Sequence, residues 1–307
     1  MSDYKIQFKV GNVYSFPIAN SNSYYTDDEC YNAFAMEMNK KSSLLRLTNT
    51  NWIKPSGLIE NGNKSMTTCR DLCRVLIEAL SYNDLCRIWN KDNRDILIKD
   101  CDYINIETSV KSQYLENYYP IIGGKTGGGD GYYGLVIVTK INNSYVVGAI
   151  LGFNSNDNRF KAMKELFDAA KITLSGGSPN QNSVTFSSYA CAYEVPNINT
   201  STIENISLLA CLYEQGADIK YAPMSTTKVM TILTALDYIR DIHFPVTITE
   251  RDLKGTANTS GCLFSDGDVV SFEDLMYAAL LPSSNQAANA IARVAGNKIL
   301  LNEKLIK

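Results

Sequence analysis

The segment from residue 118 to 171 constrains the fold more than any other stretch of the sequence. Two runs of aliphatic and β-branched residues, 133–138 and 145–151, flank a short turn that contains Asn142 and Asn143. Each run has the composition of a strand. An amphipathic stretch follows at about 157–171, with apolar residues at helical spacing on one side. The middle of the chain is therefore predicted to be β-rich, with flanking helices.

The remaining elements are expected on either side of this segment. Residues 4–16 alternate around Gly11 and Asn12, which predicts a hairpin. The polar, glycine-containing stretch 175–182 is the most linker-like stretch of the chain. Periodicity predicts strands at 183–193 and 206–213, and helices at 30–46, 69–77, 225–238, 271–281 and 285–295. We therefore expect 30–112 and 241–307 to be mostly helical.

The helix expected near residue 68 carries two closely spaced cysteines. Thr67 or Thr68 is placed to cap this helix, with Asp71 in position for a capping box. Cys69 and Cys73 are four residues apart and so share a face. Few other ligand residues lie nearby, and the eight cysteines form no Cys-x-x-Cys pair. We therefore expect small buried apolar side chains rather than a metal site.

Charge and hydropathy exclude several classes of partner. The 307 residues suffice for about two domains, or for one with a large insertion. With 29 Lys and Arg against 32 Asp and Glu, the net charge is −3, which gives no bulk attraction for nucleic acid or anionic membrane. No apolar run is long enough for a transmembrane helix. Residues 1–10 contain no apolar core of a secretory signal.

A single histidine, His243, limits the possible catalytic chemistry. A metal site built from several histidines is excluded, and a Ser-His-Asp triad would have to use His243. No Gly-x-Ser-x-Gly motif accompanies it. We therefore expect His243 to be an ordinary loop residue before a strand.

A Ser-x-x-Lys motif, Ser225 to Lys228, opens a strongly apolar helix. Residues three apart share a helix face, and a helix N-terminus favours developing negative charge. A lysine packed on an apolar helix can have a lowered pKa and act as a base toward the serine. The motif alone is also compatible with a helix cap followed by a surface lysine.

Two further short motifs carry polar side chains. Gly123 to Gly129 read Gly-Gly-Lys-Thr-Gly-Gly-Gly and place Lys125 and Thr126 on a strand. A phosphate-binding loop is disfavoured, because Tyr119 stands where the Walker pattern needs glycine and a strand follows. Residues 283–285 read Ser-Ser-Asn just before a helix, which alone indicates no more than a helix cap.

Together, Ser-x-x-Lys, Ser-x-Asn and Lys-Thr-Gly are the three elements of penicillin-binding proteins and class A β-lactamases. The sequence around them resembles the low-molecular-weight D-alanyl-D-alanine carboxypeptidases. The similar stretches are 222–231, 267–290, the segment Asn49 to Leu58, and Gly124 to Gly127 with the hairpin behind. The resemblance covers about 30–172 and 205–296. It implies an α+β fold of the β-lactamase/penicillin-binding (serine transpeptidase-like) type, an antiparallel sheet flanked by helices plus a helical subdomain.

The order of the motifs departs from this family. The family has Ser-x-x-Lys first and Lys-Thr-Gly last, whereas here Lys125 precedes Ser225 and Ser283. The sequence therefore looks circularly permuted, with the stretch 176–179 joining the family's usual ends. We expect a helical region over residues 1–112, which includes an unplaced hairpin at 1–28, a sheet region over residues 113–240, and a second helical region over residues 241–307. Gly129 also stands where the family often has threonine.

The resemblance implies a role for each motif residue. Ser225 would attack the substrate carbonyl to form an acyl-enzyme, Lys228 would take its proton, Ser283 would relay a proton to the leaving group, and Asn285 would hold Lys228 and the substrate amide. The substrate-binding residues would be Lys125, Thr126, Gly127 and Gly128. The backbone N–H groups of Ser225 and Gly128 would form the oxyanion hole. No metal or organic cofactor is needed.

The implied function is a serine DD-carboxypeptidase that cleaves the terminal D-Ala-D-Ala bond of peptidoglycan stem peptides and is acylated by β-lactam antibiotics. Such an enzyme works outside the cytoplasm, in the cell envelope or secreted. A β-lactamase-like serine hydrolase is an alternative, although the Glu-x-x-Leu-Asn deacylation motif of class A enzymes is absent. A non-catalytic binding module or an engineered permutant with a vestigial site is another.

Overall fold

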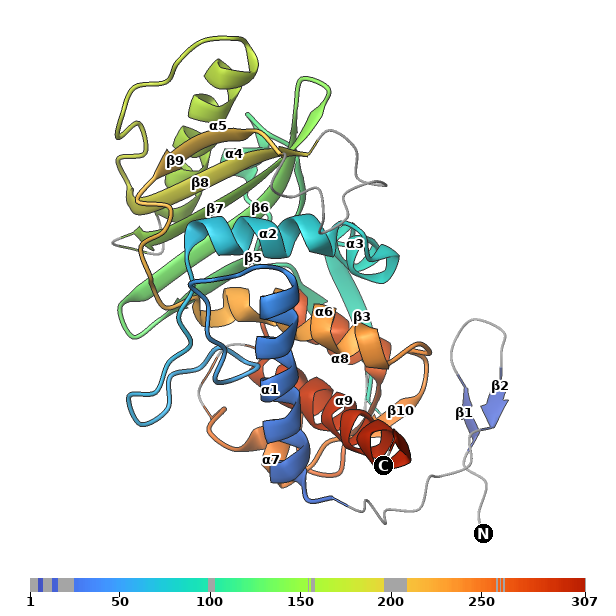
Figure 1. Cartoon of the computed structure of the whole chain (residues 1–307). Coiled ribbons are helices and arrows are strands. Elements are labelled where there is room, and N and C mark those ends of the chain that lie inside the picture. Colours follow the sequence, from blue (N-terminus) through green and yellow to red (C-terminus); the bar gives the residue numbers. More distant parts are fainter. Residues whose placement is uncertain are drawn as a thin grey trace.

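The computed structural model describes residues 5–7, 13–15, 25–98, 103–153, 155, 158–195, 209–257, 259, 261 and 263–306. Within these residues the fold is α+β, with a five-stranded antiparallel sheet above a group of helices (Figure 1). The sheet has the order β5-β6-β7-β8-β9. Its strands are β5 (Ile121–Gly129), β6 (Tyr132–Ile141), β7 (Ser144–Phe153), β8 (Ser187–Val195) and β9 (Cys211–Gln215).

The hairpin of β6 and β7 is confirmed at the centre of this sheet. Asn142, with φ of 54°, and Asn143 form the two-residue turn between the strands. Because side chains alternate along a strand, Leu135 and Ile137 pack against α5 (Arg159–Leu174), whereas Val136 and Val138 join the core on the opposite face. The sheet is therefore buried on both faces, with α4 (Gln113–Glu116) beside α5.

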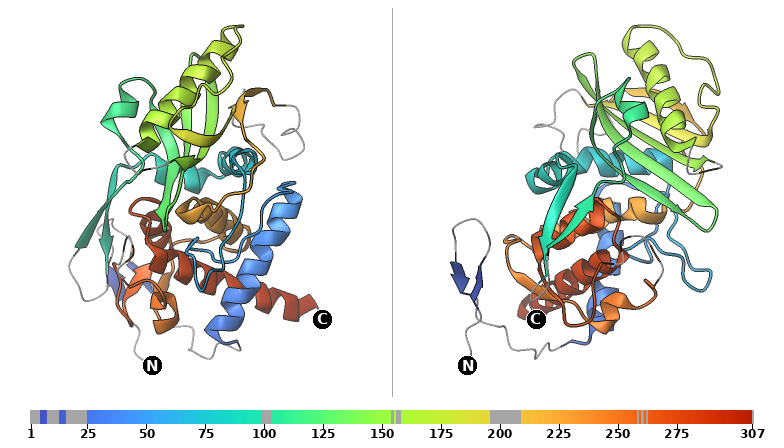
Figure 2. Two further views of the ribbon diagram at one scale, coloured as in Figure 1. Left: turned by 90° about the vertical axis from the view of Figure 1, so that its left-hand side faces the viewer. Right: turned by 180° about the vertical axis from the view of Figure 1, so that it is seen from behind.

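The helices below the sheet come from both ends of the chain (Figure 2). They are α1 (Asp27–Leu44), α6 (Thr227–Tyr238), α7 (Glu250–Leu253), α8 (Phe272–Leu280) and α9 (Asn285–Ile306). The axes of α1 and α9 approach closely at Gly296, where an added Cβ would lie 1.8 Å from the carbonyl oxygen of Cys30. Tyr25 Oη donates to the carbonyl of Leu300 at 3.3 Å, so the segment before α1 also contacts α9.

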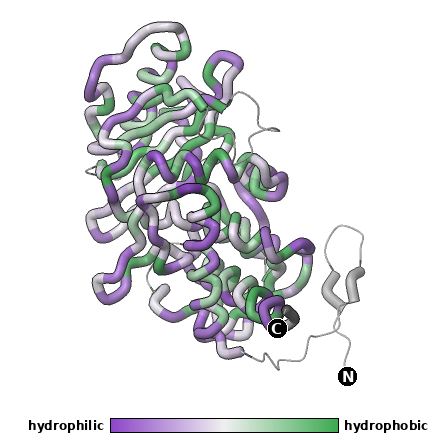
Figure 3. The backbone as a smooth tube through the Cα atoms, viewed as in Figure 1, coloured by the Kyte–Doolittle hydropathy of each residue, from purple (hydrophilic) through white to green (hydrophobic). Residues whose placement is uncertain are grey.

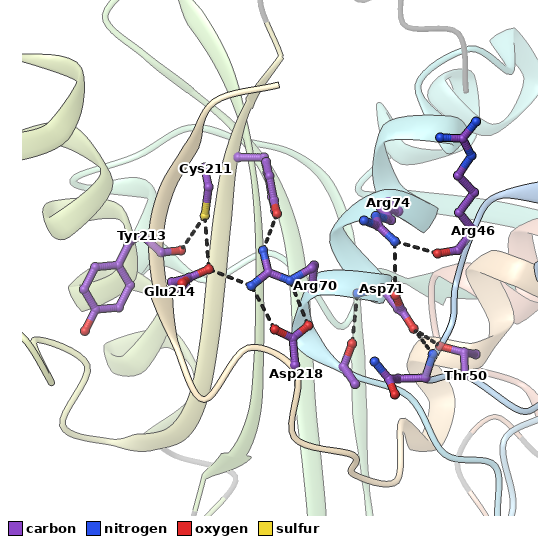
Figure 4. Close-up of polar contacts among 12 residues, drawn as sticks. Arg46, Thr50, Arg70, Asp71, Arg74, Cys211, Tyr213, Glu214 and Asp218 are labelled. Atoms are coloured by element: carbon purple, nitrogen blue, oxygen red, sulfur yellow. Dashed lines mark hydrogen bonds and ion pairs between the residues drawn. The ribbon is translucent and has the colours of Figure 1, made fainter. Parts of the chain in front are cut away.

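Helix α2 (Cys69–Ala79) lies across the other face of the sheet from α5, with α3 (Asn83–Trp89) after it. Thr68 caps α2 as predicted, and Cys69 and Cys73 are buried in the core. The predicted capping box is wrong, because the Asp71 carboxylate accepts hydrogen bonds from Asn49 N at 3.1 Å and Thr50 Oγ1 at 2.8 Å (Figure 4). These bonds fix the start of the segment that leads to residue 56.

Arg70 ties α2 to the edge of the sheet (Figure 4). Its guanidinium donates to Tyr193 Oη at 2.6 Å and to Glu214 Oε2 at 2.6 Å. It also donates from Nε to Asp218 Oδ1 at 2.8 Å. The Arg70 side chain thus bonds to β8, β9 and the turn after β9, and so fixes the angle at which α2 crosses the sheet.

Three small antiparallel pairs complete the described elements. The hairpin expected near the N-terminus is present as β1 (Lys5–Gln7) and β2 (Val13–Ser15), and Gly11 and Asn12 lie outside the described residues. The hairpin of β3 (Asn93–Leu97) and β4 (Tyr103–Glu107) falls in the region expected to be mostly helical and was not predicted. Strands β10 (Pro245–Thr247) and β11 (Val269–Ser271) form the third pair.

The hydropathy of the residues differs between the sheet and the outer loops (Figure 3). The strands of the sheet carry long hydrophobic stretches, and outer loops carry hydrophilic ones. Among the residues that the structure describes, the helices are all too short or too polar to cross a membrane.

Candidate active site

Ser225 and Lys228 lie where a short 3-10 helix, η4 (Met224–Thr226), runs into α6. Met224 has a φ of 49°, a left-handed conformation that turns the chain sharply before Ser225. The Lys228 side chain is 0% exposed because α6 is buried on nearly all sides, whereas Ser225 is half-buried. A reachable hydroxyl therefore sits beside a lysine that is shielded from water.

Four oxygen atoms surround Lys228 Nζ. The shortest contacts are 2.7 Å to Asn285 Oδ1, 2.8 Å to Ser225 Oγ and 2.9 Å to the carbonyl oxygen of Ser56. Ser283 Oγ is more distant, at 3.5 Å. The structure thus brings together the Ser-x-x-Lys and Ser-x-Asn motifs, which are more than 50 residues apart in the sequence.

The surroundings of Lys228 disfavour its charged form. Burial, and then the nearby positive charge of Lys125, hold the pKa of Lys228 well below its ordinary value. A neutral amine has two N–H donors and one lone pair. The Asn285 and Ser56 oxygens are acceptors only and engage N–H groups of Lys228, and Ser225 Oγ lies 2.8 Å from the same nitrogen, within reach of its lone pair when the amine is neutral.

Ser283 and Asn285 form the turn into α9. Ser283 has a φ of 71°, a strained conformation for a residue with a side chain. Ser284 Oγ caps α9 by accepting from Ala287 N at 3.2 Å. Gln286 is buried and its Oε1 accepts from the backbone N–H groups of Leu263 and Phe264, each at 2.8 Å. A loop after α7 is therefore anchored beside the Ser-x-Asn turn.

Lys125 and Thr126 lie on β5, the edge strand next to η4. Lys125 is 0% exposed, and its Nζ donates to the carbonyl of Thr126 at 3.0 Å. Burial, and then the charge of Arg159, lower the pKa of Lys125 to about 7. The strand approaches η4 closely at Gly127, where an added Cβ would lie 2.6 Å from the carbonyl of Pro223. Gly128, the next residue, is exposed.

Sequence reasoning missed two groups of this site. The carbonyl oxygen of Ser56 contacts Lys228, but a backbone carbonyl leaves no residue-type signal in a sequence. The hydroxyl of Ser109 lies 2.8 Å from Thr126 Oγ1. Ser109 belongs to the connection between β4 and β5, and the unpredicted hairpin places it there.

A cavity of about 290 Å³ is lined in part by Ser56. Four of the charged side chains that line it are paired, Arg251 with Asp28 and Lys54 with Glu60. No group of three or more His, Cys, Asp or Glu side chains in the described ranges could hold a metal ion. His243 is exposed in the loop before β10, as expected, with Nδ1 3.4 Å from Glu273 Oε2.

Comparison with known proteins gives one match. No curated protein and no solved structure matches the chain significantly. The family model described as D-alanyl-D-alanine carboxypeptidase matches residues 206–299, about a third of the chain. The matched segment contains Ser225, Lys228, Ser283 and Asn285, so the segment that resembles this carboxypeptidase family is the one that carries both serine motifs.

Proposed function

We propose that the chain is a serine-type D-alanyl-D-alanine carboxypeptidase that cleaves the terminal D-Ala-D-Ala bond of peptidoglycan stem peptides. The observation that carries this proposal is the contact between a half-buried hydroxyl, Ser225 Oγ, and a fully buried amine, Lys228 Nζ, at 2.8 Å. In its neutral form, which burial favours, Lys228 would accept the Ser225 proton through its lone pair. This arrangement suits a serine nucleophile activated by a lysine base. The family match over residues 206–299 supports the same assignment.

Acylation would start with the transfer of the Ser225 proton to Lys228. The Ser225 oxygen forms a bond to the carbonyl carbon of the penultimate D-Ala, and the carbonyl oxygen becomes an oxyanion. The backbone N–H groups of Ser225 and Gly128 would stabilise that charge. The C–N bond then breaks, and the leaving amine receives a proton from Lys228. Ser283, whose Oγ lies 3.5 Å from Lys228 Nζ, is placed to relay it.

Deacylation would use the same lysine. A water molecule attacks the ester, Lys228 takes its proton, and the Ser225 oxygen leaves and recovers a proton. Lys125, with Thr126, would attract the free carboxylate of the substrate to the edge of β5. A β-lactam would acylate Ser225 by the same steps, and its ring-opened product would remain as an ester. Because peptidoglycan lies outside the cytoplasm, the proposed activity belongs there.

We also propose that the order of the three motifs in this chain is a circular permutation of the family's order. One contact and one exposed loop of the fold support it. Tyr25 bonds to Leu300, so the segment before α1 and the end of α9 are neighbours, and chain ends that lie close together tolerate permutation. Residues 175–178 are exposed in the loop between α5 and β8. A rearranged chain that starts at Ser178 and links residue 306 to Tyr25 should keep its reactivity toward penicillin.

The test of the reaction is incubation with a fluorescent penicillin, followed by intact-mass measurement, with Ser225→Ala in parallel. A stable adduct that is lost in the variant, together with release of D-Ala from a stem peptide, is the expected result. Rapid turnover of penicillin without an adduct would instead identify a β-lactamase-like hydrolase. Absence of both adduct and turnover would overturn the proposal and leave a binding module.

A further inference from the structure

Ser109 connects two segments of the candidate site. Its backbone N–H donates to the carbonyl of Leu281, two residues before Ser283, at 3.0 Å. Its Oγ lies 2.8 Å from Thr126 Oγ1 on β5. Ser109 is half-buried, so its hydroxyl is held by the fold yet remains partly accessible.

The hydroxyls of Ser109 and Thr126 have two protons between them, and only one of these can lie in the hydrogen bond that joins the two oxygens. One proton lies between Thr126 Oγ1 and Ser109 Oγ, and the other is left for a ligand. Lys125 Nζ donates to Thr126 Oγ1 at 3.5 Å. Because Thr126 Oγ1 accepts from Lys125, its own proton points away from Lys125, toward Ser109. The chain then runs from Lys125 through Thr126 to Ser109, whose own O–H is free to donate.

The strand itself offers no other hydroxyl at this place. Thr126 is followed by three glycines, Gly127 to Gly129, so β5 has no further side-chain donor beyond Thr126. A hydroxyl at the end of a chain of hydrogen bonds is a strengthened donor, because each bond in the chain polarises the next. An anionic group with two acceptor oxygens is the ligand that suits a terminal hydroxyl beside a buried lysine.

We propose that Ser109 binds the free C-terminal carboxylate of the peptide and so makes the site select chain ends over internal peptide bonds. This role deepens the proposed function and depends on it for the identity of the peptide. An internal peptide bond, or a C-terminal amide, offers a neutral oxygen in the same place. The acceptor of the hydrogen bond from Ser109 is then uncharged, so Ser109 gives such a ligand none of the advantage that it gives a free carboxylate.

The experiment measures equilibrium binding in the Ser225→Ala background, where no turnover occurs. The probes are an Nα-acylated D-Ala-D-Ala peptide and its C-terminal amide, with calorimetry as the readout. Ser109→Ala should lower the affinity for the carboxylate peptide roughly tenfold or more. The affinity for the C-terminal amide should stay within about twofold of its value without this substitution. Ser109→Thr keeps the hydroxyl and should restore most of the affinity.

Ser112→Ala is the matched control, because Ser112 lies three residues further on and its side chain makes no capping bond. The backbone bond from residue 109 to Leu281 survives each substitution, so thermal unfolding should change little. Equal losses for both peptides, no loss for either, or no binding of the carboxylate peptide when Ser109 is intact would overturn the role of Ser109. Whether the proposed function stands is read separately, from the penicillin adduct of the unsubstituted protein.

Discussion

The carbonyl oxygen of Ser56 accepts a hydrogen bond from Lys228 Nζ at 2.9 Å, although the two residues are 172 positions apart in the sequence. The neighbouring Gly57 makes this contact possible. It has a φ of +79°, and an added Cβ would lie 2.0 Å from the carbonyl oxygen of Met224, the residue before Ser225. The segment that carries Ser56 is therefore pressed directly against the backbone that presents the nucleophile.

Gly57→Ala should consequently destabilise the fold and abolish acylation by penicillin. The alanine would have to adopt a left-handed φ and also displace Met224, at a combined cost of about 3 kcal/mol or more. Gly62→Ala is the matched control, because Gly62 has a nearly identical φ of +77° but nothing within 4 Å of the added Cβ. It should cost only about 1 kcal/mol and keep the adduct. Equal losses of stability in the two variants, measured by denaturant unfolding, would contradict the contact with Met224.

Lys228→Arg should be as inactive as Lys228→Ala. An arginine keeps the positive charge, but it cannot be deprotonated in a protein and so offers no lone pair to Ser225. We expect the rate of penicillin acylation to fall by about 10²–10⁴-fold in both variants, the range typical of a lost general base. Intact-mass time courses give the rate. Substantial acylation in the arginine variant would mean that Lys228 acts through its charge and not as a base.

Asn285→Asp should move the pH dependence of acylation. Asn285 Oδ1 is neutral and accepts from Lys228 Nζ at 2.7 Å. A carboxylate in the same place favours the ammonium form, so the pKa of Lys228 should rise and the acidic limb of the rate profile should move to higher pH. Asn285→Ala removes an acceptor without adding charge and should not move the limb upward. An unmoved limb in the aspartate variant would separate Lys228 from the rate-controlling proton.

The elements that could be predicted from the sequence share a strong periodic signal. The hairpin of β6 and β7 has continuous apolar runs, the pattern of strands buried on both faces, and the helix after it has apolar residues at helical spacing. The hairpin of β3 and β4 lacks such a signal, because each strand has five residues of which a single isoleucine, Ile96 or Ile106, is buried. Its position is decided by tertiary contacts, and the location of Ser109 depends on it.

The candidate site likewise contains residues whose proximity the sequence predicts and others whose position depends on long-range contacts. Ser225 and Lys228 are three residues apart, and their proximity follows from helical geometry alone. The approach of Lys125 and Asn285 to them is a long-range contact, which the sequence indicates only through resemblance to a family. Ser56 contributes a backbone atom, so neither its residue type nor its spacing points to it.

Lys125→Met should change how stability depends on pH. The folded pKa of Lys125 is about 7, below its ordinary value of 10.5, because the amine is fully buried. Between these two values the unfolded chain binds a proton that the folded chain lacks, so this lysine makes stability rise with pH, by up to about 1.4 kcal/mol per unit. Methionine fills a similar volume and binds no proton. The free energy of unfolding of the variant should therefore depend less on pH. The variant should exceed the unsubstituted protein in stability by the largest amount near or below pH 7. Denaturant unfolding at pH 7 and pH 9.5 measures the difference, with the exposed Lys171→Met as the control. The prediction is contradicted if the free energies of unfolding of the Lys125 variant and the unsubstituted protein differ by the same amount at both pH values. Lys125 would then keep its proton in the folded state.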